Sequence, residues 1–155
     1  MRYPHLASRV FDTPLMVAKG KADIIVQVLR PRFFGSEDHE EKGGDGCEQK
    51  EYTITREGIA LIPICGTLVR KGGWMSAMSG LCSYERIERD VMDAATDPRV
   101  KGILLDVDSP GGEVSGLFDL LDVLTEAAAL KPMYAVANDD CFSAAYAIAS
   151  CAERI

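Results

Sequence analysis

Long apolar runs alternate with amphipathic segments along the chain from residue 52 onward. The nearly uninterrupted runs are rich in Ile, Leu and Val, which is typical of strands buried in a parallel sheet. They predict strands over Gly58–Leu68, Gly102–Val107 and Tyr134–Ala137. Between these runs, apolar or Ala-rich segments follow the spacing of helices that bury one face. They predict helices over Tyr84–Ala95, Glu113–Leu130 and Ser143–Ala152.

The alternation of strands and helices predicts an α/β domain with a parallel sheet. Ser83 directly precedes the first helix and is predicted to N-cap it through its hydroxyl. Pro98 and Pro132 follow the first and second helices, which end there because proline cannot continue a helix interior. Val69–Cys82 predicts a long loop, and Glu153–Ile155 predicts the approach to a further strand.

Composition divides the chain into three parts. Residues 1–34 hold one apolar stretch, Ala22–Leu29, which ends before Pro31. Residues 35–51 are polar, charged and Gly-containing, so they cannot bury enough apolar surface to offset their ordering entropy. We therefore expect an N-terminal arm over residues 1–34, a flexible acidic linker over 35–51 and a folded domain over 52–155.

The net charge of −7 is concentrated in the linker, which contains seven acidic residues and only two lysines. The rest of the chain is nearly neutral, so the basic face of a nucleic-acid-binding protein is not expected. The five cysteines include no CxxC pair and are odd in number, which favours a reducing compartment. With no signal-peptide pattern and no apolar run of about 20 residues, we expect a cytoplasmic protein without a stable membrane span.

Two loops are predicted at the carboxyl ends of the parallel strands, where sites collect in α/β sheets. One is Asp108–Gly112, and the other is Asn138–Phe142, which leads into Ser143. Glycines after a strand leave backbone N–H groups open to a developing negative charge. By itself, however, such a Pro-Gly-Gly turn is also the ordinary way to relieve crowding between a strand and a helix.

Ser143 follows the second of these loops and starts the third predicted helix. A hydroxyl there is a candidate nucleophile. The N–H of Ala144 would point at the negative charge that develops when this hydroxyl attacks a substrate. A serine before a helix is also the common N-cap, so the interpretation of Ser143 as a cap stays open.

The segment KGILLDVDSPGGEVSG, followed by FSAAYAIAS, resembles the signal peptide peptidase (protease IV) family. It is most similar to the phage and prophage branch, which includes head-maturation (prohead) proteases. The resemblance extends to GIALIPICGTLVRKGGWMSAMSGLCSYERI and PHLASRVFDTPLMVAKGKA and leaves out mainly the acidic linker. It implies the Clp protease and crotonase-like fold of repeated ββα units. It also implies that Ser143 is the nucleophile, that Gly111 and Ala144 form the oxyanion hole, and that Gly112 supports the turn.

The general base is not identified among the residues of this chain. His5 lies in the arm and His39 in the linker, so a Ser-His-Asp triad is not expected. The resemblance implies a Ser-Lys dyad, in which burial lowers the lysine pKa so that the amine accepts a proton. In the resembled family this lysine lies several dozen residues after the serine, so we expect it beyond Ile155.

The lysines within the domain are poorly placed for this role. Lys101 and Lys131 each precede a strand, which puts them at the opposite edge of the sheet from the two loops. Lys71 is on the correct side, but its neighbours indicate an exposed loop, and a solvated lysine keeps a pKa of about 10.4.

Other reactive residues have a simpler interpretation. Cys141 precedes Ser143 by two positions, but no histidine is placed to activate it, and a buried apolar role is expected. Adjacent acids in the second loop indicate a solvated loop, and no cluster has metal-ligand spacing, so no metal site is expected. These acids are Asp139 and Asp140. Two interpretations stay open for Trp74, Met75 and Met78: they form an apolar lip that faces a substrate or a membrane, or they simply pack against the domain.

These observations predict a serine endopeptidase without a cofactor, acting on protein or peptide substrates. The resemblance implies a homo-oligomer and contacts with phage capsid or portal proteins. Two alternatives stay open. One is a crotonase-like acyl-CoA enzyme that uses the same glycine turn on a thioester. The other is a catalytically inactive remnant that acts in assembly or protein interaction.

Overall fold

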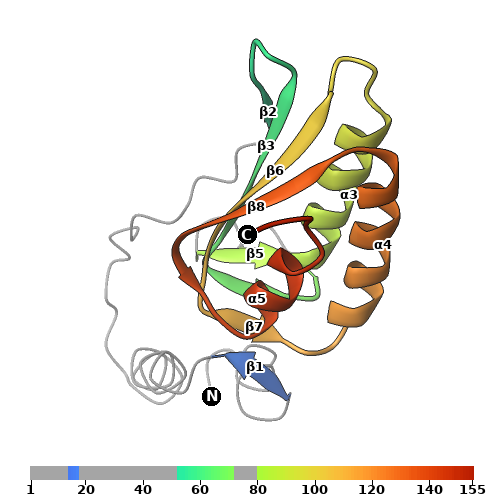
Figure 1. The fold of residues 1–155 in the computed structure, drawn as a ribbon. Coiled ribbons are helices and arrows are strands. Elements are labelled where there is room, and N and C mark those ends of the chain that lie inside the picture. The colour runs from blue at the N-terminus through green and yellow to red at the C-terminus, as the bar shows by residue number, and fades with distance from the viewer. Residues whose placement is uncertain (1–13, 18–51, 72–79) are drawn as a thin grey trace, which may run out of the picture.

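The computed structural model describes residues 14–17, 52–71 and 80–155. The strands are β1 (Leu15–Val17), β2 (Thr53–Ile54), β3 (Ile59–Cys65), β4 (Thr67–Val69), β5 (Leu81–Ser83), β6 (Gly102–Ser109), β7 (Gly111–Glu113) and β8 (Met133–Cys141). The helices are α3 (Tyr84–Thr96), α4 (Leu117–Leu130) and α5 (Ala144–Ala149). Together they form a mixed α/β fold with two small sheets (Figure 1).

The larger sheet has the order β2-β3-β6-β8. β3, β6 and β8 run parallel, as the apolar runs predict, while β2 is an antiparallel edge strand. Side chains along β3 alternate between buried and half-buried, so one face of the sheet carries the core. Helices α3 and α4 cover that face (Figure 1). The parallel sheet predicted from the sequence is therefore confirmed.

The helices form where the apolar spacing predicts them. α3 buries Ile87, Val91 and Ala94 on one side, and Ser83 caps it by accepting the Arg86 N–H at 3.3 Å. α4 buries three leucines in the core and begins at residue 117, four positions later than predicted. The delay arises because Glu113 belongs to a strand and because Gly116, with φ +81°, turns the chain into the helix.

The smaller sheet has the order β1-β7-β4-β5, and the sequence pattern did not predict it. The predicted strand Gly58–Leu68 is in fact two strands, because Gly66 at φ +77° turns the chain from the larger sheet into the smaller one. The predicted loop Val69–Cys82 likewise contributes the end of β4 and the start of β5. A single apolar run thus contributes one strand to each of the two sheets.

Two further predictions are wrong near the chain's C-terminal part. Asn138–Phe142 was expected to be a loop, but β8 continues to Cys141 and pairs with β6 through a register shift between Val107 and Ser109. The third helix ends at Ala149 rather than at residue 152. The expected approach to a strand is confirmed, because the Glu153 N–H donates to the Met133 carbonyl and the Ala135 N–H to the Arg154 carbonyl.

Candidate active site

Ser143 has an unusual backbone conformation at the junction of β8 and α5. Its φ of +57° and ψ of −114° make it the one non-glycine residue with positive φ among residues 14–17, 52–71 and 80–155. Ser143 occupies the N-cap position of α5, but its side chain makes no capping hydrogen bond, so the expectation that its hydroxyl caps the helix is wrong. Such a backbone costs about 1–3 kcal/mol and persists only where the surrounding structure enforces it.

Gly111 lies directly against Ser143. A Cβ built on Gly111 would stand 3.2 Å from the Ser143 Cβ and 3.0 Å from the Phe142 carbonyl oxygen. A backbone bond from the Phe142 N–H to the Ser109 carbonyl, at 3.1 Å, fastens the serine's neighbour to the end of β6. The structure therefore brings together the two strand ends that the sequence predicted to converge.

Ser109 connects these segments through its side chain. It is fully buried, and its hydroxyl donates to the Gly66 carbonyl at 2.7 Å while accepting the Gly111 N–H at 3.2 Å. The Gly111 amide therefore has an acceptor in this form of the protein. A role in binding an oxyanion requires that this hydrogen bond be shared or exchanged when a substrate arrives.

Gly112 is the central residue of β7 and lies between two neighbouring strands. It is opposite Leu68 of β4 and opposite Met16 of β1. A Cβ at this position would clash with the Leu68 carbonyl oxygen, so only glycine permits β7 to lie this close to β4. The packing of β7 against β4 therefore requires a glycine at this position.

Ala144 is the third predicted contributor, and it is fully buried at the first position of α5. The following amides bond in the usual way, the Ala145 N–H to the Phe142 carbonyl and the Ala147 N–H to the Ser143 carbonyl. Within the described part of the chain, the Ala144 N–H has no such acceptor. It belongs to the residue that directly follows Ser143.

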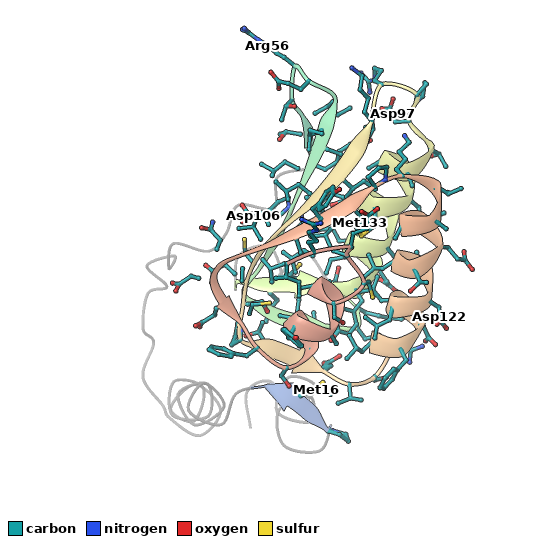
Figure 2. The ribbon with its side chains drawn as sticks, viewed as in Figure 1. Met16, Arg56, Asp97, Asp106, Asp122 and Met133 are labelled. Atoms are coloured by element: carbon teal, nitrogen blue, oxygen red, sulfur yellow. The ribbon has the colours of Figure 1, made fainter. Side chains whose placement is uncertain are left out.

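The three lysines considered as bases occupy other places. Lys131 donates through Nζ to the Ala94 and Asp97 carbonyls at the end of α3. Figure 2 shows Asp97 at the opposite end of the molecule from Met16, which flanks Gly111. Lys101 precedes β6 and packs near Gly58 at that same far end. Its placement and that of Lys131 at the wrong edge are confirmed.

Lys71 follows β4, on the side of the smaller sheet. Its side chain is 70% exposed, and its ammonium lies 3.6 Å from the Glu85 carboxylate. The exposed position expected from the sequence is confirmed. An exposed lysine that pairs with a carboxylate is not the buried amine that a Ser-Lys dyad requires.

Neither the thiol nor the acids near Ser143 form a competing centre. Burial raises the pKa of the Cys141 thiol, which lowers the fraction of nucleophilic thiolate. The Asp140 N–H donates to the Asp108 carboxylate at 3.2 Å, which joins β8 to the end of β6. Among the described residues, no group of His, Cys, Asp and Glu is arranged to hold a metal ion. Trp74, Met75, Met78, His5, His39 and the acidic linker lie outside the described residues.

A buried polar clamp that the sequence did not indicate holds β7 in place. The Tyr84 hydroxyl donates to the Glu113 carbonyl at 2.5 Å, and the Glu113 carboxylate accepts the Arg70 N–H at 2.8 Å. Burial raises the pKa of Tyr84, so the hydroxyl stays protonated and remains a donor. Neither Ser109 nor Glu113 stands out in the sequence, because their partners come from distant segments. The one signal was their position on either side of the Pro-Gly-Gly turn.

Two curated phage proteins match almost the whole chain. Capsid assembly protease C of Escherichia phage lambda is 34% identical over 169 aligned residues, which take in 97% of this chain and 38% of that protein. Head-tail preconnector protein GP5 of Enterobacteria phage P21 is 35% identical over 151 residues, or 95% of this chain and 30% of that protein. The chain therefore spans about a third of the length of these relatives. No family model matches it.

The helices of residues 14–17, 52–71 and 80–155 give no indication of a membrane-spanning segment. Each is too short or too polar to cross a bilayer.

Proposed function

We propose that the chain carries the nucleophile of a serine endopeptidase that acts in phage head assembly. The observation that carries this proposal is the backbone of Ser143. A strained strand-to-helix turn that presents a serine hydroxyl, with glycine backbone packed against it, is the arrangement used by hydrolases with a nucleophilic serine. The absence of a capping hydrogen bond leaves that hydroxyl without a structural task in the helix.

In the proposed reaction, the Ser143 Oγ attacks the carbonyl carbon of a peptide bond while a base accepts its proton. The negative oxygen of the tetrahedral intermediate is held by the N–H of Ala144, and by the N–H of Gly111 once it exchanges its bond with Ser109. The base then gives the proton to the leaving amine as the C–N bond breaks. Water hydrolyses the resulting acyl-enzyme and restores the serine.

The base in this proposal is a lysine, as the resemblance to signal peptide peptidases implies. The positions of Lys71, Lys101 and Lys131 support a lysine from outside the described residues rather than one of these three. The order of elements also supports the Clp protease and crotonase-like fold. β3 enters the larger sheet, β4 and β5 enter the smaller one, and α3 follows. β6 then enters the larger sheet, β7 enters the smaller one, and α4 follows.

The proposed substrates are proteins of the phage head. This part of the proposal rests on the two relatives, whose names refer to capsid assembly and to the head-tail preconnector. We also propose a homo-oligomer, as the resemblance implies, and contacts with capsid or portal proteins.

The proposal is tested by treating the intact gene product with a fluorophosphonate probe, which labels activated serines covalently. We expect labelling of the wild type and a loss of at least about 10³-fold in Ser143→Ala, because the nucleophile is removed. The matched control is Ser150→Ala, which alters an exposed serine whose hydroxyl donates to the Ala147 carbonyl in the same helix. Labelling or casein cleavage that persists in Ser143→Ala contradicts the proposal.

A further inference from the structure

Strand β1 lies on the free edge of β7, beside the proposed active site (Figure 1). The two strands are antiparallel, with Leu15 opposite Glu113, Met16 opposite Gly112 and Val17 opposite Gly111. At the end of this short ladder the Val114 N–H donates to the Pro14 carbonyl at 3.3 Å. Because hydrogen-bonded and non-hydrogen-bonded pairs alternate in an antiparallel ladder, Met16 and Gly112 are then a hydrogen-bonded pair.

This pairing brings the backbone of β1 against the catalytic turn. A Cβ built on Gly111 would clash with the Met16 carbonyl oxygen and would lie 3.2 Å from the Ser143 Cβ. The Met16 carbonyl and the Ser143 side chain therefore flank the same α-carbon. An extended stretch of this chain passes beside the proposed nucleophile in the direction opposite to β7.

An extended peptide that adds a strand to an exposed sheet edge is a general mode of peptide recognition. The backbone supplies the hydrogen bonds, so many sequences can take the same place. The edge of β7 that faces β1 is such an edge, and it carries Gly111 and Gly112. A peptide substrate that pairs there would have its carbonyl groups at the height of Ser143, where the Met16 carbonyl now lies.

We propose that β1 occupies the position of the peptide substrate, so that residues 15–17 act as an internal pseudosubstrate. This inference rests on the proposed function, since it assigns the strand on which the substrate of the same site binds. The chain then competes with substrates for its own active site. A peptidase that must meet its substrates inside an assembling particle gains from such a contact, because the site stays covered until another extended segment displaces β1.

The small size of β1 makes this displacement feasible. The strand has three residues and pairs on one side, and Met16 is half-buried, packed at the margin of the core (Figure 2). A segment with few buried contacts opens at low free-energy cost compared with the core strands. The sequence of β1, Leu-Met-Val, is apolar, and two aromatic side chains close to Ser143 in the sequence, Phe142 and Tyr146, are exposed. The expected substrate segment is therefore extended and apolar.

The test uses Met16→Pro in the intact protein, because proline removes the N–H that Met16 contributes to the ladder. Met16→Leu is the matched control, since it keeps the backbone N–H and an apolar side chain. We expect Met16→Pro to react with the fluorophosphonate at least about fivefold faster than the wild type, as the covered fraction becomes accessible. Hydrogen exchange of the Val114 amide should become faster in the same variant and stay unchanged in Met16→Leu.

A second experiment replaces the lost contact between β1 and β7 with a peptide added in solution. A synthetic peptide of residues 12–20 (DTPLMVAKG) should slow the labelling of Met16→Pro and restore the protection of the Val114 amide, whereas a scrambled peptide should do neither. The inference is overturned if Val114 exchanges faster in Met16→Pro while the labelling rate stays at the wild-type value. It is equally overturned if Val114 is unprotected in the wild type or unaffected by Met16→Pro.

Failure of the proposed function gives a different result. In that case no variant is labelled at all. The Val114 amide still reports whether β7 accepts the peptide of residues 12–20, so the two failures are distinguishable.

Discussion

Two serines in the described part of the chain stand at the junction of a strand and a helix, and only one of them caps the helix through its hydroxyl. Ser83 ends β5, has φ −91° and ψ 145°, and accepts the Arg86 N–H of α3. Ser143 follows β8, has φ +57° and ψ −114°, and its side chain makes no hydrogen bond to α5. The two share a residue type and a sequence context. The backbone conformation separates a serine that stabilises a helix from one whose hydroxyl is left available for chemistry.

The neighbours of the two serines explain the difference. Ser83 lies in a regular strand, so its side chain turns toward the open N–H groups of a 13-residue helix. Ser143 has Gly111 packed against its Cβ, and the bond from Phe142 to Ser109 holds the preceding residue. Tertiary contacts therefore impose the conformation of Ser143, while local preferences are sufficient for Ser83.

The largest effect is expected from Gly112→Ala. This change disturbs the glycine turn that packs against Ser143 and that has no counterpart beside Ser83. The added methyl would clash with the Leu68 carbonyl oxygen, and this backbone atom cannot move without shifting β4. We expect a loss of about 3 kcal/mol in the free energy of unfolding and slower labelling of Ser143. Urea denaturation measures the first effect. Gly102→Ala is the control, because its methyl would meet ordinary contacts of 3.4 Å and 3.6 Å.

Ser83→Ala should separate the roles of the two serines. Loss of the cap leaves the Arg86 N–H without its acceptor, so we expect the free energy of unfolding to fall by about 1 kcal/mol. Labelling of Ser143 by the fluorophosphonate should be unchanged. Ser143→Ala should show the reverse, with labelling lost and stability nearly unchanged. A stability loss of similar size in both variants would mean that Ser143 caps its helix after all.

Ser143→Gly should relieve the strain that distinguishes the two junctions. Glycine adopts positive φ without steric cost, so the protein should gain up to about 1 kcal/mol after the entropy cost of glycine in the unfolded chain. Ser150→Gly is the matched control, because Ser150 has ordinary helical angles, and this change should destabilise. Thermal unfolding compares the two. Destabilisation by Ser143→Gly would show that the serine conformation is not strained.

The smallest effect concerns the other end of the helix that Ser83 caps. Hydrogen bonds from Arg99, together with its charge, lower the pKa of Asp97 to about 2. Because the folded pKa lies below the unfolded value of 3.8, the stabilisation is present above about pH 4 and is lost as the pH falls toward 2. We therefore expect Asp97→Asn to be slightly less stable than wild type at pH 6, with the difference shrinking at pH 3.

Urea titrations at the two pH values measure this difference. Arg99 is largely exposed, so added salt should also reduce the effect. A difference that grows as the pH falls would contradict the assigned direction of the Asp97 pKa.

Local pattern predicted the elements that depend on local physics. Helix α3 follows from the spacing of Ile87, Val91 and Ala94 and from the cap at Ser83, and the parallel strands follow from their apolar runs. The second sheet was missed because its strands are only three residues long. Strands this short have no readable period, and their pairing depends on segments far away in the chain.

The candidate site was predicted in part. The residues Gly111, Gly112, Ser143 and Ala144 were named from the sequence, and the structure brings Gly111 and Ser143 into contact. The functions of these residues stay predictions until the labelling is measured. Ser109 and Glu113 could not be found beforehand, because their importance depends on hydrogen bonds to Gly66, Arg70 and Tyr84. Nothing in the chain near either residue indicates those partners.

The sequence by itself determined the α/β alternation, the glycine turn and the choice of serines that could act. It left Ser143 with two interpretations, because a nucleophilic serine and an N-cap serine both appear in a sequence as a serine directly before a helix. Only the tertiary structure showed that the Ser143 side chain makes no capping hydrogen bond, since the positive φ of Ser143 results from packing against Gly111 and from the anchored Phe142. The tertiary structure also placed β1 on β7, a pairing between distant residues that local preferences cannot encode.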